Sequence, residues 1–335
     1  MRVLTFFLVL MLCGRFGSVA ATDFTAGGLS PAGTAADQYW QTYATNIAEA
    51  SKGEIRPKLL TRGEIGSEDQ ILTSLRRDRI QVAINGFLAL TAVIPELDVL
   101  GAPYLFSSAE EMTFITENHL TPVLQRLFDA KDLVLLRVLP MGWMRVYSKT
   151  PALVPADLKG RKVRVPPDIA SRYYLESLGY DLIPIASTDV VQSLQTGLVE
   201  AGTTVTLNYL WSGTQTEAPH LTLTAHSFLY TALFVNKAWW QKLPPAHRDI
   251  LQASAPSGRA FFDSMTATEQ EVLANAAAKN FTIHTLTPDQ RALWAATSKD
   301  VQARISDRVG GDSKKILDAV SAGAAEYQSG HAKPN

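Results

Sequence analysis

The amino-acid sequence predicts an α/β fold of roughly two domains. Strand-like and helix-like segments alternate along most of the chain, a pattern typical of βαβ units with mainly parallel sheets. The chain has 335 residues, 46% of them hydrophobic, which is enough to build a large core. The last third, from Pro244 to Tyr327, is almost entirely helical in pattern, so we expect a helical segment to lie over the two α/β domains.

Local periodicity predicts the individual elements. Residues 34–51 repeat apolar and aromatic side chains at helical spacing. A second helix is expected to begin near Ser67, because Glu68 and Asp69 then lie in its first turn, where the helix dipole favours acidic side chains. The predicted strands are residues 55–60, 80–84, 97–105, 134–138, 162–165 and 182–185. Further helices are expected at residues 109–127, 171–178 and 188–196.

The N-terminus has the pattern of a cleaved export signal, predicted as residues 1–21. Arg2 is followed by a ten-residue apolar run, 3–12, and by small residues around Ala20 and Ala21 that suit cleavage. The apolar run is too short to span a bilayer, so we expect a periplasmic protein that does not insert into the membrane. Cys13, the only cysteine, lies inside the signal, which excludes disulfides and thiolate sites from the mature chain.

The formal net charge of −1 gives the chain no general attraction for nucleic acid. An anion would have to bind at a local site, and residues 156–167 provide a candidate. Alternation along the predicted strand puts Val163 and Val165 on one face and Arg164 on the other, near the carboxyl end where open α/β sheets bind ligands. A guanidinium there can hold a carboxylate through two parallel hydrogen bonds. The alternative is a surface arginine in an ordinary ion pair.

Five segments in order resemble the solute receptors of tripartite ATP-independent periplasmic (TRAP) transporters, the DctP-type proteins. They are GEIGSEDQIL (63–72), IPELDVLGAPYLFSSAEE (94–111), DLKGRKVRVPP (157–167), PIASTDVVQSLQTGLVEAG (184–202) and FVNKAWWQKLPPAHRDILQASA (234–255). The resemblance covers about residues 30 to 255. Each motif alone is weak evidence for this family, whereas five motifs in the family's order behind an export signal are specific evidence for it.

The resemblance implies a two-lobed periplasmic-binding-protein fold with a hinge, a long bridging helix and a helical C-terminal segment. Lobe I is expected to contain residues 22–145 plus about 230–270, and lobe II residues 146–229 plus about 271–330. The resemblance also implies that the lobes close on an organic acid whose carboxylate meets Arg164. Arg145 is the second arginine of the family pattern; an arginine that pins the domain crossing is the equally good alternative for it.

The sequence departs from the family where Thr204 stands in place of an asparagine that donates a hydrogen bond to the ligand carboxylate. A threonine hydroxyl still donates one hydrogen bond, but it is shorter than an amide, so a different ligand geometry is expected. Four further residues are predicted near the ligand on weaker grounds: Asn208, Asn85, Glu68 and Trp211. Packing between domains is the alternative for Trp211, and capping of a helix is the alternative for Glu68.

No catalytic or metal-binding motif is present in the sequence. The six histidines form no H-E-x-x-H or H-x-H pair, and the G-x-S-x-G, G-x-G-x-x-G and G-x-x-x-x-G-K-[ST] motifs are absent. We therefore expect no cofactor, no metal and no enzymatic activity. The partners that the resemblance implies are a small-molecule carboxylate and the small and large membrane subunits of a TRAP permease. A periplasmic sensor that feeds a signalling kinase is the first alternative, and the sequence does not separate it from a transport receptor. A periplasmic enzyme is the second alternative, for which the sequence offers no motif.

Overall fold

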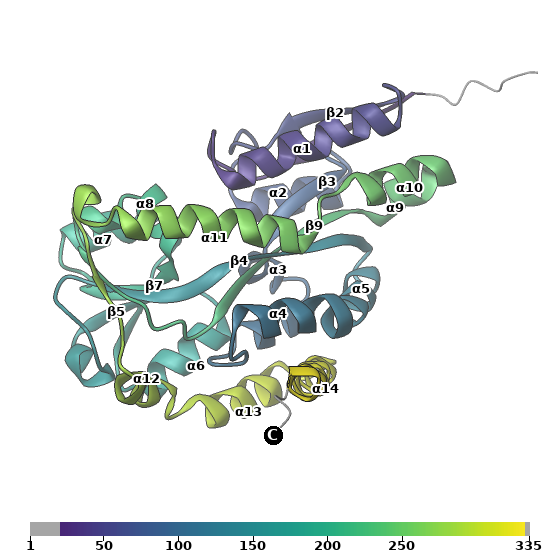
Figure 1. Cartoon of the computed structure of the whole chain (residues 1–335). Helices are drawn as coiled ribbons and strands as arrows, with labels where there is room; N and C mark the ends of the chain where they lie inside the picture. The colour runs from purple at the N-terminus through teal and green to yellow at the C-terminus, as the bar shows by residue number, and fades with distance from the viewer. Residues whose placement is uncertain (1–20, 332–335) are drawn as a thin grey trace, which may run out of the picture.

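The computed structural model describes residues 21–331, and its strands form a ten-stranded sheet (Figure 1). The main path of the sheet runs β2-β1-β3-β9-β4-β7-β5-β6, with β8 beside β4 and β10 beside β8. The long strand β4 (Leu133–Ser148) divides it into two halves. We call β1, β2, β3 and β9 sheet I, and β5, β6, β7, β8 and β10 sheet II; β4 is common to both.

Sheet I combines three strands from the start of the chain with one from its last third. Its strands are β1 (Thr22–Gly27), β2 (Ile55–Leu60), β3 (Val82–Gly86) and β9 (Phe228–Asn236). β1 pairs in parallel with β2 and β3, whereas β9 pairs antiparallel with β3 and β4. The helices between these strands are α1 (Ala35–Ala50), α2 (Glu68–Arg76) and α3 (Phe87–Leu90). Thr34 and Ser67 cap α1 and α2 by accepting backbone hydrogen bonds, which fixes where both helices begin.

Sheet II follows the βαβ pattern that the alternating segments predict. Its strands are β5 (Lys162–Val165), β6 (Asp181–Pro184), β7 (Ala201–Val205), β8 (His220–Thr222) and β10 (Thr282–His284). β5 pairs in parallel with β6 and β7, so the carboxyl ends of these three strands lie at the same edge. The helices of this half are α6 (Ile169–Ser177), α7 (Val190–Gln195) and α8 (Thr206–Trp211).

Two elements connect the halves. Residues 133–143 of β4 pair with β9, and residues 144–148 pair with β7, so one strand passes from sheet I to sheet II. Helix α11 (Gly258–Ala274) lies across β4 and reaches α8, as Figure 1 shows in light green. The chain thus has the long bridging helix that the resemblance to the DctP-type proteins implied, together with a strand common to both sheets.

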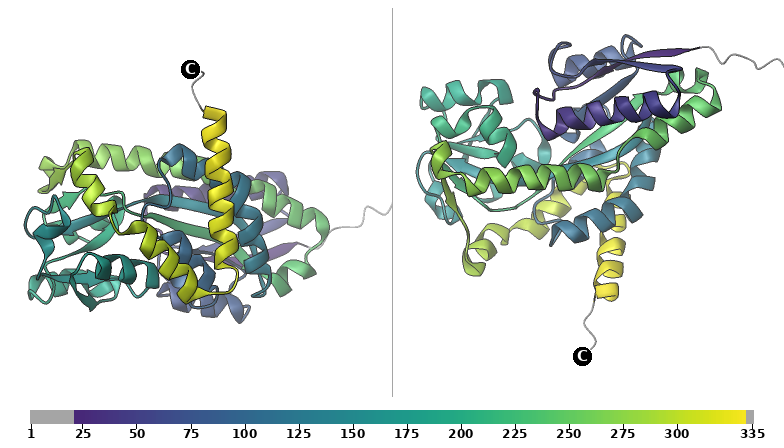
Figure 2. Two further views of the ribbon diagram at one scale, coloured as in Figure 1. Left: turned by 90° about the horizontal axis from the view of Figure 1, so that it is seen from below. Right: turned by 45° about the horizontal axis from the view of Figure 1, so that its top comes forward.

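The remaining helices lie around these sheets. They are η1 (Pro95–Gly101), α4 (Ala109–Ile115), the π-helical turn η2 (Thr116–Leu120), α5 (Thr121–Asp129), η3 (Pro155–Leu158), η4 (Ser187–Asp189), η5 (Thr214–Thr216), α9 (Lys237–Lys242), α10 (Pro245–Ser254), η6 (Ala277–Lys279), α12 (Pro288–Ala295), α13 (Ser298–Val309) and α14 (Ser313–His331). α13 packs on α6 and η1, and α14 packs on α4 and η2. Figure 2 shows α14 extending beyond the body of the molecule at its C-terminal end. The helical C-terminal segment is confirmed.

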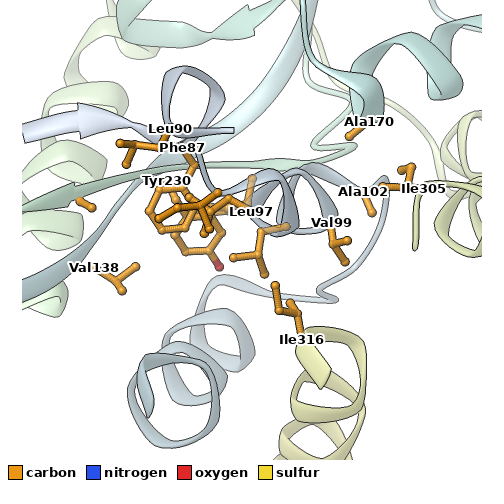
Figure 3. Close-up of a cluster of buried hydrophobic side chains, with 14 of the residues drawn as sticks. Phe87, Leu90, Leu97, Val99, Ala102, Val138, Ala170, Tyr230, Ile305 and Ile316 are labelled. Carbon is orange, nitrogen blue, oxygen red and sulfur yellow. The ribbon is translucent and has the colours of Figure 1, made fainter. Parts of the chain in front are cut away.

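The largest hydrophobic core extends under both halves of the sheet. Phe87 stacks on Tyr230 at a ring-centroid distance of 5.5 Å on the sheet I side. Figure 3 shows these rings beside Leu97 of η1, with Ala170 of α6 farther along the same cluster. Because α6, α13 and α14 share this core with strands of sheet I, the two halves are packed together on this side.

The structure corrects part of the predicted secondary structure. Residues 97–105, predicted as a strand, instead lie mostly in the 3₁₀ helix η1 and its following turns. Pro95 at the start and Pro103 after the end favour this compact form, and Leu97, Val99 and Leu100 are buried without strand pairing. The predicted helix 109–127 is interrupted by η2, and the strand predicted at 134–138 is part of the much longer β4.

Within the described residues, no helix is both long and apolar enough to cross a membrane. The predicted signal peptide, residues 1–21, falls outside the described part of the chain except for Ala21.

Candidate functional site

Arg164 is a buried cation near the carboxyl end of β5. Val163 and Val165 on the other face enter the large hydrophobic core, which is the alternation the sequence predicts, and the arginine itself is only 7% exposed. Its Nε donates to the carbonyl of Ile185 at 3.0 Å and its Nη1 to the carbonyl of Thr203 at 3.4 Å. No carboxylate of the described residues forms a salt bridge with it. Burial lowers the pKa of Arg164, because the charged form loses its hydration.

The side chain of Tyr147 lies near Arg164 and beside Gly202 of β7. Tyr147 of β4 is paired with Gly202 of β7, and a side chain at Gly202 would collide with the Tyr147 hydroxyl. That hydroxyl is buried and has no hydrogen-bond partner. Burial raises the pKa of Tyr147 to about 12, with the charge of Arg164 opposing the shift. The hydroxyl is therefore protonated at neutral pH and is available as a hydrogen-bond donor on the arginine's face of the sheet.

Arg145 shares that face but has a carboxylate partner. It pairs with Thr204 across the β4–β7 ladder, so both predicted residues lie side by side. Arg145 Nη2 donates to Oε1 of Glu269 at 3.1 Å, and the same oxygen accepts from the Thr206 hydroxyl at 2.5 Å. Arg145 is 8% exposed, and its Nε has no partner. The ion pair joins β4 to the bridging helix α11.

Two carboxylates meet at the start of α6, close to Arg164. Asp168 caps the helix by accepting from the backbone N–H of Ser171 at 2.7 Å. Asp98 of η1 accepts from the N–H groups of Ile169 and Ala170 at 3.0 and 3.2 Å. Burial, aided by the charge of Asp168, raises the pKa of Asp98 to about 6. Burial also raises the pKa of Asp168, although the Ser171 hydrogen bonds and Arg164 oppose the shift.

Asn85 and Glu68 lie together at the carboxyl end of β3 in sheet I. The Asn85 side-chain amide donates to the backbone carbonyl of Glu68 at 2.9 Å, and Gly86 N–H donates to Glu68 Oε1 at 2.6 Å. Asn85 is fully buried, yet its Oδ1 has no partner. Burial raises the pKa of Glu68. Glu68 therefore binds the β3 backbone rather than capping its own helix, where Ser67 has that role.

The remaining predicted residues lie on α8 and on β7. Asn208 and Thr204 are half-buried, and the side chain of neither has a hydrogen-bond partner within the described chain. Trp211, expected in the cleft or in packing between domains, is 36% exposed at the end of α8. A surface hollow at the β1–β2 edge is lined by other residues and contains none of the predicted site residues.

Several buried polar atoms without partners belong to strands of both halves and to the cap of α6. Such atoms are rare in proteins and mark places where a ligand or water completes the hydrogen bonding. Five of the ten such atoms within the described chain are in β3, β4, β7 or the cap of α6, namely in Asn85, Arg145, Tyr147, Thr203 and Asp168. Among residues 21–331, no group of three or more histidine, cysteine or acidic side chains has the arrangement of a metal site.

Comparison with known proteins places these features in a family. The model of the bacterial extracellular solute-binding protein family 7, DctP, matches residues 26–308. The chain belongs to this family. It is thus a TRAP-type periplasmic solute-binding protein, and members of the family are receptors rather than enzymes.

Individual relatives are distant in sequence and close in fold. The C4-dicarboxylate-binding periplasmic protein DctP of Rhodobacter capsulatus is 23% identical over 93% of this chain and 91% of its own length. The sugar acid binding protein DctPAm of Advenella mimigardefordensis, in complex with galactonate, has a TM-score of 0.83 at 18% identity, covering 91% of this chain and 99% of that one. A TRAP periplasmic solute-binding protein of Chromohalobacter salexigens with bound D-glucuronate has a TM-score of 0.80 at 20% identity. The similarity covers 90% of this chain and 99% of that one.

Sequence reasoning missed Glu269, Tyr147 and the Asp98–Asp168 pair. Glu269 contacts Arg145 across 124 positions, and no local motif marks that contact. A signal for Tyr147 was available, because it follows Arg145 by two residues and so shares its face of β4. Asp168 was also recognisable as a helix cap, since it follows Pro166-Pro167 and precedes a helical pattern.

Proposed function

We propose that this receptor binds a small organic acid through Arg164 and delivers it to the small and large membrane subunits of a TRAP permease. The ligand carboxylate accepts hydrogen bonds from the guanidinium, with Thr204 and the Tyr147 hydroxyl as neighbouring donors. Arg145, Asn208, Asn85 and Glu68 lie near the ligand in this proposal. The chain reaches the periplasm through its N-terminal signal.

One observation carries the proposal: Arg164 is a buried guanidinium without a carboxylate partner. A buried charge is normally paired, because desolvation is costly. Its Nη2 donates to no protein acceptor, which leaves the two hydrogens of Nη2 for a ligand carboxylate. The two-lobed fold supports closure of the lobes over such a ligand.

The test begins with the natural ligand, identified by mass spectrometry of molecules released from freshly purified protein. Arg164→Ala should weaken its binding about 30-fold or more, because truncation costs roughly 2–5 kcal/mol when the ligand's charge loses its partner. Isothermal titration calorimetry measures the change. Arg161→Ala is the matched control, since Arg161 lies three residues away in an exposed ion pair with Glu200. Wild-type affinity in Arg164→Ala would contradict the site.

A further inference from the structure

The two arginines on the site face of sheet II have different electrostatic surroundings. Arg145 is in contact with the Glu269 carboxylate, whereas Arg164 donates only to backbone carbonyls. Both residues are more than nine-tenths buried, so solvent screens neither charge strongly. The formal charge of the Arg145–Glu269 pair is zero, and that of Arg164 is +1.

Glu269 is held in place by more than the arginine. It comes from the bridging helix α11, and its Oε1 accepts from the Thr206 hydroxyl at the start of α8 as well as from Arg145. Two donors, one on β4 and one on α8, thus orient one carboxylate oxygen. A ligand carboxylate that approached Arg145 would meet this resident carboxylate first, and two like charges at hydrogen-bond distance from one guanidinium repel each other.

No other predicted site residue supplies a second positive charge. Thr204, Asn208, Asn85 and Trp211 are uncharged, and Glu68 is acidic. The carboxylate of Asp168, whose charge acts on Arg164 without forming a salt bridge, caps the N-terminus of α6, where the helix dipole favours a negative charge. Arg164 therefore remains the single cation without a carboxylate contact among these residues.

We propose that Glu269 sets the charge specificity of the site: by pairing with Arg145 it restricts the ligand to organic acids with one carboxylate and excludes dicarboxylates. This inference rests on the proposed function, because it assumes that ligands bind at Arg164. It makes Glu269 a specificity-determining residue through its effect on Arg145, without direct contact to the ligand.

Two pairs of acids test the inference; the members of each pair share one carbon skeleton and differ only in whether they carry a second carboxylate. Galactarate carries a second carboxylate where galactonate has a terminal hydroxymethyl group, and succinate carries one where butyrate has a methyl group. Thermal-shift and calorimetric titrations of the wild type should show binding of a monocarboxylate and at least tenfold weaker binding of its dicarboxylate partner. In Glu269→Gln, which frees the charge of Arg145, the affinity for the dicarboxylate should rise on the order of tenfold relative to the monocarboxylate.

Two further variants distinguish an effect of charge on ligand preference from an effect of the substitution on folding. Glu271→Gln removes an equal charge from the same helix at an exposed position and should leave the preference unchanged. The double variant Arg145→Gln with Glu269→Gln restores the charge balance. The ratio of its monocarboxylate affinity to its dicarboxylate affinity should return toward the wild-type ratio, although both affinities can be lower because Arg145 lies near the ligand, and this holds even if Glu269→Gln alone is less stable.

The possible outcomes distinguish the two proposals. A wild type that binds a dicarboxylate as tightly as its monocarboxylate partner, with the ratio unaltered in Glu269→Gln, overturns the role of Glu269 while leaving carboxylate binding intact. A wild type that no member of either pair stabilises, and whose natural ligand lacks a carboxylate, contradicts the proposed function and the inference together.

Discussion

At the scale of single residues, the site face of sheet II combines satisfied and unsatisfied tyrosine hydroxyls. Tyr147 and Tyr209 stack with their ring centroids 6.2 Å apart, and both are buried. The Tyr209 hydroxyl donates to the carbonyl of Ala218 at 2.7 Å, whereas the Tyr147 hydroxyl has no partner. A buried hydroxyl without a partner lowers stability, so it is retained for a reason other than folding.

Tyr147→Phe should raise the free energy of unfolding of the unliganded protein by about 1 kcal/mol, because it removes an unsatisfied buried hydroxyl. It should also weaken carboxylate binding if the hydroxyl donates to the ligand as proposed. Urea denaturation and calorimetry measure the two effects. Tyr209→Phe is the control and should lose about 1 kcal/mol, since it breaks an existing hydrogen bond. A loss of stability in Tyr147→Phe would contradict this account.

Residue-scale prediction from the sequence succeeded where a local pattern was sufficient. The burial of Val163 and Val165 opposite Arg164 follows from strand alternation. The role of Arg164 as a ligand contact stays a prediction. The ion pair of Arg145 with Glu269 depends on how α11 crosses β4, and strand periodicity contains no information about that crossing.

At the scale of elements, three backbone N–H groups at the start of helix α6 donate hydrogen bonds to acidic side chains, and a cation lies nearby. Asp98 reaches its first turn from η1, which explains why residues 97–105 are not a strand: the segment presents a carboxylate to a helix N-terminus instead of backbone groups to a neighbouring strand. The apolar residues of this segment favour a strand when the sequence is considered alone. The contacts that the segment makes in the folded protein determine its 3₁₀ conformation instead.

Asp98→Asn should remove a pH-dependent contribution to stability. The pKa of Asp98 is raised to about 6 in the folded state, so the folded protein binds a proton there that the unfolded chain, with an ordinary pKa, releases. This contribution to the free energy of unfolding grows as the pH falls from about 7 toward 4. The wild type should therefore gain stability relative to Asp98→Asn over that range.

Thermal unfolding of both proteins at several pH values measures this difference. Comparing the two proteins cancels the opposite effect of His226, whose pKa is lowered to about 3 by burial and which stays neutral in the folded protein. Asp181→Asn, at an exposed position on β6, is the control and should follow the wild type. A constant difference between wild type and Asp98→Asn at all pH values would show that Asp98 does not titrate as stated.

At the scale of the whole molecule, the passage of β4 between the two halves depends on a local irregularity. The pairing of β4 with β9 shifts register between Pro140 and Gly142, just before the strand turns to β7 at Met144. Gly142 has a φ of +149°, which side chains rarely tolerate. The sequence predicted only residues 134–138 of this strand, because Pro140 and Gly142 interrupt the apolar run. The lobe boundary at 145/146 stays a prediction.

Gly142→Ala should lower the free energy of unfolding by about 1–3 kcal/mol, because alanine is strained at this φ although nothing nearby would collide with its Cβ. Urea denaturation measures the loss. Gly330→Ala, on an exposed turn of α14 with open space around it, should be neutral or slightly stabilising. Equal effects of both substitutions would argue against backbone strain at the crossing.

The position of β9 also governs the order in which the polypeptide can acquire its structure. β3 and β4 are joined only through β9, so the interior of sheet I is incomplete until residue 236 has been synthesised. Contacts so distant along the chain slow folding, since a long loop must close before they form. A nascent chain that stops before Phe228 therefore lacks the β3–β9 and β9–β4 pairing at the centre of sheet I.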